Sequence, residues 1–186
     1  MSVRSAIHHE SQRRRINVVG TSGSGKTTVA RAISERLGIP HIEMDGLFWK
    51  PDWGETPDSE LLPRVDEETD RSAWVLDGNY SRTRPIAWPK ADTIVWLDYS
   101  FPRVFSQLLW RTIRRAVTRE PMWGGCRESF RISFFSRDSI LVWCLRTYWK
   151  RRRNYPDILS RPEYARLNVI RLRSRRQLRA WLDDLN

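Results

Sequence analysis

A phosphate-binding loop near the start of the chain constrains the fold more than any other feature of the sequence. Residues 20–27, GTSGSGKT, match the pattern G-x-x-x-x-G-K-[ST]. The apolar run INVV (16–19) before the loop is typical of a buried strand, and apolar residues recur at helical spacing after it until Gly38. Because such a loop works only between a strand and a helix, this context argues against a chance match.

The residue types in this loop indicate nucleotide binding. Glycines let the backbone curl so that successive N–H groups face phosphate oxygens, and the following helix adds the positive end of its dipole. We expect Lys26 to reach the β- and γ-phosphates and the Thr27 hydroxyl to bind Mg²⁺. The sequence lacks the guanine-reading pattern N-K-x-D, which favours ATP. The residues expected to hold ATP are Gly20, Thr21, Ser22, Gly23, Ser24, Gly25, Lys26, Thr27 and Thr28.

Strand and helix patterns alternate along the rest of the chain. Four further apolar runs indicate strands, at 41–45, 73–77, 93–98 and 168–172. Helical patterns lie at 58–71, 101–120 and 138–152, and a final helix begins at the capping box formed by Ser174 and Gln177. The alternation predicts an α/β fold with a parallel sheet covered on both faces. We expect one domain over 16–186, preceded by a disordered basic tail at 1–15.

Three aspartates follow predicted strands, namely Asp45, Asp77 and Asp98. Parallel strands bring their carboxyl ends to one edge of the sheet, where ligands bind. Each aspartate alone could be a turn residue or a helix cap. Three in the same situation predict that at least one serves the metal or the substrate.

The stretch VLDGNYSRT (75–83) resembles the DG(F/Y)PRT segment of adenylate kinases. With MDGLFWKPDW (44–53) and VIRLRSRRQLRAWL (169–182), it makes the chain similar, over residues 16–183, to adenylate-kinase-related P-loop NTPases often labelled DNA topology modulation proteins. The resemblance implies a five-stranded parallel sheet of the nucleoside/nucleotide kinase group. It also implies that Asp77 lies near Mg²⁺, that Arg82 faces a phosphate of the acceptor, and that Asp45 contacts the acceptor or the metal.

A row of arginines predicts a lid over the nucleotide. Arg111, Arg115 and Arg119 recur at every fourth position of the predicted helix 101–120, and the following loop contains a Gly-Gly pair able to act as a hinge. We place the lid at about 111–153. The alternative is that the row is only the solvated face of an amphipathic helix. Trp49 and Tyr80 are further candidates for contact with the acceptor.

These features predict an ATP-dependent, Mg²⁺-dependent phosphotransferase. Its catalytic residues would be Lys26, Asp45, Asp77, Arg111, Arg115 and Arg119, with Thr27 and Asp77 at the metal. Asp45 would orient or deprotonate the acceptor hydroxyl. A simpler alternative is a protein that binds the nucleotide but has little catalytic activity.

A second function is compatible with the basic charge of the chain. The net charge is +11, and YWKRRRNY (148–155) mixes cations with aromatic rings, as surfaces for single-stranded nucleic acid do. An ATP-dependent nucleic-acid-binding protein is therefore the alternative. No apolar run approaches the ~20 residues of a membrane helix, which excludes a membrane partner. Two cysteines without a disulfide or metal pattern indicate the cytoplasm.

Overall fold

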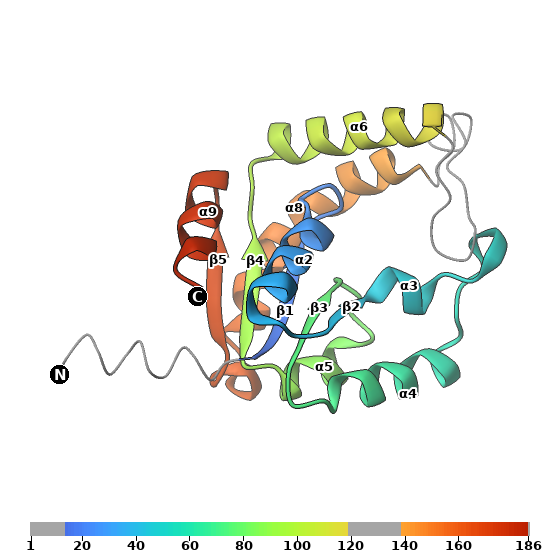
Figure 1. Ribbon diagram of the computed structural model, residues 1–186. Helices are drawn as coiled ribbons and strands as arrows, with labels where there is room; N and C mark the ends of the chain where they lie inside the picture. Colours follow the sequence, from blue (N-terminus) through green and yellow to red (C-terminus); the bar gives the residue numbers. More distant parts are fainter. Residues whose placement is uncertain (1–13, 119–138, 186) are drawn as a thin grey trace.

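Five parallel strands form a single sheet with the spatial order β2-β3-β1-β4-β5 (Figure 1). The computed structural model describes residues 14–118 and 139–185. The strands are β1 (Arg15–Gly20), β2 (His41–Glu43), β3 (Trp74–Asp77), β4 (Thr93–Leu97) and β5 (Asn168–Leu172). Because parallel neighbours require crossover connections, helices cover both faces. The predicted α/β fold with a five-stranded parallel sheet is confirmed.

The helices agree with the predicted pattern except at three places. They are α2 (Lys26–Leu37), α3 (Met44–Phe48), α4 (Asp58–Thr69), α5 (Arg84–Lys90), α6 (Phe101–Thr118), α8 (Ile140–Leu159) and α9 (Arg175–Asp183), with the short 3-10 helices η1 (Pro51–Trp53) and η3 (Pro162–Tyr164). The predicted second strand is too long, because β3 ends at Asp77 opposite Glu43 and offers no partner beyond it. The chain turns into α3 there, so Asp45 lies in a helix.

The other two differences concern prolines. Helix α5 was not predicted, since Pro85 and Pro89 both lie in it; Pro85 is tolerated because the first turn has no N–H partner to lose. Helix α8 continues past its predicted end at residue 152 and contains Pro156. Packing of the buried Tyr155 compensates for the hydrogen bond that Pro156 cannot donate.

Alternate residues of the three central strands, β3, β1 and β4, pack into two separate apolar clusters. Val18 packs with α2, α6 and α9 on one face, and its neighbour Val19 packs with α3, α4 and α5 on the other. Both valines are fully buried. The two clusters fix the strands on both sides, so the carboxyl edge of the sheet is rigidly placed.

Helix α8 passes from one cluster to the other. Tyr148 lies in the first cluster and donates a hydrogen bond of 2.9 Å to the carbonyl oxygen of Tyr99. Tyr155, two turns later, lies in the second cluster, where its ring stacks on Trp96 at 5.3 Å between centroids. Since 3.6 residues make one turn, Arg151 lies midway between them. The helix thereby brings Arg151 to the carboxyl end of the sheet.

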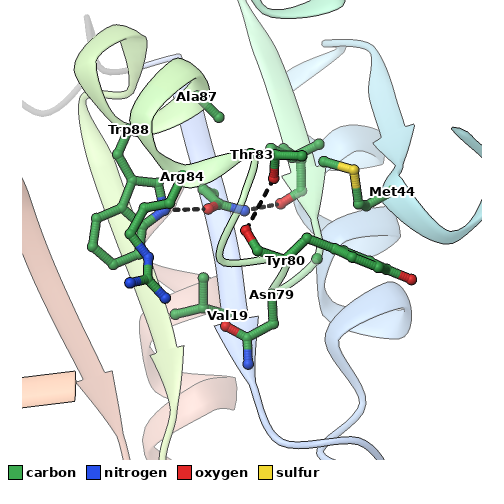
Figure 2. A pocket seen from close by; sticks show the side chains of 11 residues that line it. Val19, Met44, Asn79, Tyr80, Thr83, Arg84, Ala87 and Trp88 are labelled. Carbon is green, nitrogen blue, oxygen red and sulfur yellow. Dashed lines mark hydrogen bonds between the residues drawn. The ribbon is translucent and has the colours of Figure 1, made fainter. Parts of the chain in front are cut away.

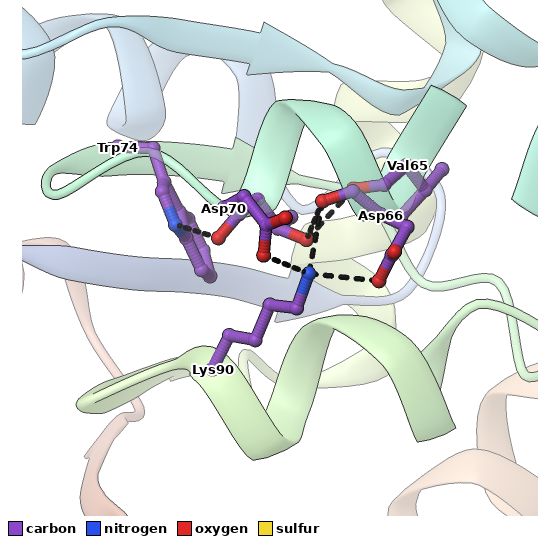
Figure 3. A network of polar contacts seen from close by, with 6 residues as sticks. Val65, Asp66, Asp70, Trp74 and Lys90 are labelled. Atoms are coloured by element: carbon purple, nitrogen blue, oxygen red, sulfur yellow. Dashed lines mark hydrogen bonds and ion pairs between the residues drawn. The ribbon is translucent and has the colours of Figure 1, made fainter. Parts of the chain in front are cut away.

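A lysine joins α4 and α5, two of the helices that cover the second face (Figure 3). The Lys90 ammonium, at the end of α5, donates 2.7 Å to Asp66 Oδ1 and 2.9 Å to the Asp66 carbonyl, and it also pairs with Asp70. Both aspartates belong to the carboxyl end of α4, where a cation also complements the helix dipole. These contacts fix α5, whose first turn lines the site.

Several predictions fall on residues outside the described part of the chain. These are most of the tail 1–15, Arg119, one of the two cysteines (Cys126) and the centre of the predicted lid. The single domain over 16–186 and the lid at 111–153 remain predictions. Among the described residues, no helix is long and apolar enough to cross a membrane.

Candidate active site

The loop between β1 and α2 is held open by two glycines in the left-handed region. Gly25 (φ 88°) precedes α2, and among the described residues no side chain caps that helix. Its first N–H groups, which have no intrahelical acceptors, are therefore available to an anion. Gly23 (φ 86°) touches α6, because an added Cβ would lie 2.7 Å from Cβ of Leu108 and 2.9 Å from the Val104 carbonyl oxygen. Helix α6 thus braces the outer turn of the loop.

Lys26 lies at the meeting point of four charged side chains. Burial lowers the pKa of its ammonium to about 8; the nearby Asp45 and Asp77 oppose that change, and Arg151 and Arg111 add to it. The ammonium donates a hydrogen bond of 3.4 Å to the Thr21 carbonyl oxygen. The structure therefore brings together four of the six residues named as a catalytic set, Lys26, Asp45, Asp77 and Arg111, and places Arg151 with them.

Asp77 and Thr27 are the two residues predicted to hold the metal. Asp77 is the last residue of β3 and is buried, with Oδ2 3.8 Å from Nε2 of His41. Thr27 is the second residue of α2 and half-buried. Among the described residues, no three His, Cys, Asp or Glu side chains gather as a metal cage. A hydroxyl and one carboxylate fit Mg²⁺, which takes its remaining ligands from water and phosphates.

Asp45 is held by a tyrosine from the segment after β3. The Tyr80 hydroxyl donates a hydrogen bond of 2.6 Å to Asp45 Oδ1. Burial raises the pKa of Tyr80 well above its ordinary value, and the Asp45 charge adds to the effect. Tyr80 therefore remains a donor. Its neighbour Asn79 donates 3.3 Å to the Gly20 carbonyl oxygen, so this segment contacts both α3 and the loop.

Asp98 is held by arginine side chains and does not belong to the group of charges around Lys26. Arg171 donates to its Oδ2 through Nε at 2.9 Å and Nη2 at 2.7 Å. Arg152 lies 3.2 Å away and Arg173 3.8 Å. Charge-assisted pairs of this kind fix the carboxylate. Of the three aspartates predicted from the strand ends, Asp45 and Asp77 are the two that act on Lys26.

The arginine and the tryptophan predicted to meet the acceptor are engaged elsewhere. Arg82 donates 2.7 Å to Asp58 and 3.2 Å to Glu55, and its guanidinium lies 4.8 Å from the centre of the Phe48 ring. Trp49 packs edge-to-face on Phe48 at 4.7 Å. Both residues contact the segment around η1, and neither lines the two hollows at the carboxyl edge of the sheet.

Two hollows lie on either side of β1 at the carboxyl edge of the sheet. The first lies between β3 and α5 and is lined by Val19, Met44, Asn79, Tyr80, Arg84 and Trp88 (Figure 2). The second lies under α8 and is lined by Gly20, Thr21, Asp98, Tyr148, Arg151 and Tyr155. The sequence reasoning missed Arg84 and Arg151. Arg84 stands two residues after the matched Arg82, so only the geometry separates them.

The basic run 150–153 does not form one surface. Arg151 is half-buried beside Lys26, and Arg152 pairs with Asp98. Lys150 and Arg153 are exposed, whereas Tyr148 and Tyr155 are buried. Two of the four cations predicted to bind nucleic acid, Arg151 and Arg152, and both tyrosines are therefore engaged within the protein.

The arginine row on α6 is partly drawn into the site. The buried face of α6 is Val104, Leu108, Thr112 and Ala116. Arg111 and Arg115 flank this face and are half-buried, whereas Arg114 is exposed. Arg111 lies close enough to Lys26 to affect its pKa. The arginine row therefore does not consist only of solvent-exposed side chains, because Arg111 and Arg115 are half-buried.

Sequence comparison relates half of the chain to kinases. No known family profile matches it. The chain is 35% identical over 101 residues to the "Putative adenylate kinase" of Thermococcus onnurineus, an alignment that covers 50% of this chain and 53% of that protein. The chain therefore spans about half the length of the curated relatives it matches.

Structure comparison covers nearly the whole chain. The shikimate kinase from Acinetobacter baumannii superposes with a TM-score of 0.59 over 96% of this chain and 94% of its own, at 17% identity. The gluconokinase from Sinorhizobium meliloti gives 0.52 over 94% and 92%, at 21% identity. The chain has the fold of these P-loop kinases. None of the three names refers to DNA topology, so that label finds no support here.

Proposed function

We propose that the chain is a phosphotransferase that moves the γ-phosphoryl group of ATP to a small acceptor. One observation carries the proposal. A lysine of the phosphate loop, two aspartates from the ends of neighbouring elements and two arginines from α6 and α8 converge at the carboxyl edge of the sheet. Ligands bind at this edge in parallel α/β proteins.

The loop residues 20–28 are proposed to hold the triphosphate. Backbone N–H groups at the start of α2 would donate to its oxygens, and Lys26 would neutralise the β- and γ-phosphates. Thr27 and Asp77 are proposed to hold Mg²⁺, which when bound neutralises charge on the phosphates.

Asp45 is proposed to orient or deprotonate the attacking hydroxyl of the acceptor. The hydrogen bond from Tyr80 holds one carboxylate oxygen, so that the other is left to face the acceptor. A base so placed must lie within hydrogen-bond reach of the proton it takes. The first hollow, which borders Tyr80 and Met44, is the place proposed for the acceptor.

Arg111 and Arg151 are proposed to stabilise the transferred phosphoryl group. Charge develops on its oxygens in the transition state, and fixed cations in a site that excludes water stabilise that charge strongly. The half-buried Arg115 and the sequence-predicted Arg119 are proposed to assist.

The test is a phosphotransfer assay with labelled ATP and Mg²⁺. It uses a panel of nucleosides, nucleoside monophosphates, hydroxylated carboxylic acids and sugars, with single- and double-stranded DNA in parallel. Asp77→Asn is expected to lower kcat at least about 100-fold. Asp157→Asn, an exposed position on α8 that lines neither hollow, is the matched control and should retain activity.

Two outcomes would contradict the proposal. One is full turnover by Lys26→Met, because the site would then not need its central cation. The other is ATP turnover that only DNA stimulates and that releases free phosphate, because a transferase passes the group to an acceptor.

A further inference from the structure

His41 lies beside the carboxylate that is proposed to hold the metal. It is the first residue of β2, the strand at one edge of the sheet, and it pairs in register with Val75, two positions before Asp77 on β3. Because alternate residues of a strand share a face, His41 and Asp77 lie on the same face of the sheet. Val75 packs there against α2, which is the helix that carries Thr27. The imidazole therefore lies on the face where the phosphate loop continues into its helix.

The contact between the two side chains is close but falls short of a hydrogen bond. Nε2 of His41 lies 3.8 Å from Oδ2 of Asp77, and both side chains are largely buried. Among the described residues, this buried nitrogen has no hydrogen-bond partner, which costs free energy if it carries a proton. A hydrogen bond from nitrogen to a carboxylate is about 2.7–2.9 Å long, so a displacement of about 1 Å would form one.

The other ring nitrogen faces a carboxylate that already has a cation. Nδ1 of His41 lies 4.0 Å from Oε1 of Glu43, and the guanidinium of Arg31 lies 3.6 Å from the same oxygen. Arg31 reaches it from α2, about one turn beyond Thr27. The more buried carboxylate, Asp77, is faced by Nε2. Since the hydrogen bond of a histidine sets which nitrogen carries the proton, Nε2 is the better place for it.

We propose that His41 is a positioning residue of the metal site, whose Nε2–H binds Oδ2 of Asp77 and so leaves Oδ1 to face Mg²⁺. The inference rests on the proposed function, since Asp77 is the carboxylate proposed there to hold the metal. Carboxylates that bind metals are in turn held by hydrogen bonds from residues that do not touch the metal. The role needs only the N–H and no change in the charge of the ring.

The test compares nucleotide binding with and without the metal. A fluorescent ATP analogue is titrated into the full chain in EDTA and in saturating Mg²⁺. The dissociation constant in EDTA divided by that in Mg²⁺ reports how strongly the complex favours the metal. We expect His41→Asn to lower this ratio about 10-fold, with little change in the dissociation constant in EDTA. Mere damage to the fold would instead weaken binding in both solutions.

Two amides at the same position separate positioning from packing. The side-chain nitrogen of glutamine reaches about as far as Nε2 of histidine, whereas that of asparagine reaches only as far as Nδ1. His41→Gln should therefore retain most of the ratio that His41→Asn loses. Arg31→Gln, which removes the cation from Glu43 and does not touch Asp77, is the control and should leave the ratio unchanged.

A double variant shows whether His41 acts through Asp77. Asp77→Asn should lower the ratio at least as far as His41→Asn does, and His41→Asn should lower it no further in that background. Urea unfolding identifies the conditions in which every variant is folded. The proposal would be overturned by a wild-type ratio that Mg²⁺ does not raise, by an unchanged ratio in His41→Asn, by equal losses in the two amide variants, or by a further loss in the double variant.

The phosphotransfer assay distinguishes failure of this inference from failure of the proposed function. If His41→Asn and Asp77→Asn both lower the ratio but no acceptor is ever phosphorylated, the proposed function fails and the positioning role stands. If an acceptor is phosphorylated, and Asp77→Asn lowers the ratio whereas His41→Asn does not, the positioning role fails and the function stands.

Discussion

The hydroxyl of Tyr80 lies 2.6 Å from Oδ1 of Asp45, so the segment after β3 positions a carboxylate on α3. The two residues are 35 positions apart in the chain. The contact is reinforced where Gly78 meets α3, since a Cβ on that glycine would overlap the Met44 side chain. The close approach of these segments is what lets a tyrosine hydroxyl reach the aspartate.

Tyr80→Phe is expected to lower kcat roughly 10- to 100-fold, with the KM for ATP unchanged. A hydrogen bond to a charged group contributes about 1.5–3 kcal/mol, and each 1.4 kcal/mol corresponds to a factor of ten. The measurement is steady-state kinetics once an acceptor is known. Tyr164→Phe, which removes a hydroxyl on η3, is the control. An unchanged or raised kcat in Tyr80→Phe would mean that Tyr80 does not support Asp45.

Gly23→Ala is expected to destabilise the fold by about 2–4 kcal/mol, because left-handed backbone strain adds to overlap with α6. Gly25→Ala has nearly the same φ but nothing within 4 Å of its added Cβ, so we expect only about 1–2 kcal/mol. Urea unfolding of both variants measures the difference. Equal destabilisation would show that α6 does not press on the loop.

The parts of this molecule that follow from short-range sequence patterns were predictable. The phosphate loop needs only local spacing, and the strands that end at Asp77 and Leu97 are continuous apolar runs bounded by polar residues. The helix at α9 was signalled by its cap, and the Ser174 hydroxyl indeed accepts from the Gln177 N–H at 3.1 Å.

The parts of the molecule that depend on tertiary contacts were not predictable from the sequence. Nothing local tells Arg82 from Arg84; the first meets Asp58 and Glu55, which lie on another segment of the chain, and the second meets a tryptophan of its own helix. The run 150–153 looks like one basic surface, but α8 turns Arg151 and Arg152 inward toward Lys26 and Asp98. Such assignments require the relative placement of helices, which periodicity does not contain.

Asn17→Leu is expected to destabilise the fold by about 2–4 kcal/mol. Asn17 is buried on β1 and uses its amide twice, donating 2.9 Å to the Leu76 carbonyl oxygen and accepting from Trp88 Nε1. Leucine leaves both buried groups without a partner, at about 1–3 kcal/mol each. Urea unfolding of Asn17→Leu, Trp88→Phe and the double variant checks this. If the two effects simply add, the residues are not coupled.

The lowered pKa of Lys26 predicts how nucleotide binding depends on pH. In the free protein, Lys26 should be half-charged near pH 8, whereas an ordinary lysine has a pKa of 10.5. Bound phosphates favour the charged form and raise this pKa. At a pH between the pKa of Lys26 in the free protein and its higher pKa in the nucleotide complex, binding must therefore take up a proton. The affinity for the nucleotide must then fall as the pH rises above 8.

The free energy of unfolding of the free protein depends on pH in the opposite sense, through the same Lys26 ammonium group. Between pH 8 and 10.5 the unfolded chain keeps a proton on Lys26 that the folded chain has lost, so the contribution of Lys26 to stability rises with pH over this interval. Calorimetric titration of ATP with Mg²⁺ at pH 9, in buffers of different ionisation enthalpy, measures the proton uptake, and Lys26→Met should abolish it. Urea unfolding at pH 7.5 and 9.5 should show that Lys26→Met stabilises more at the lower pH. Equal stabilisation at both values would place the pKa of Lys26 at its ordinary position and remove the basis for its buried, charge-coupled role in the loop.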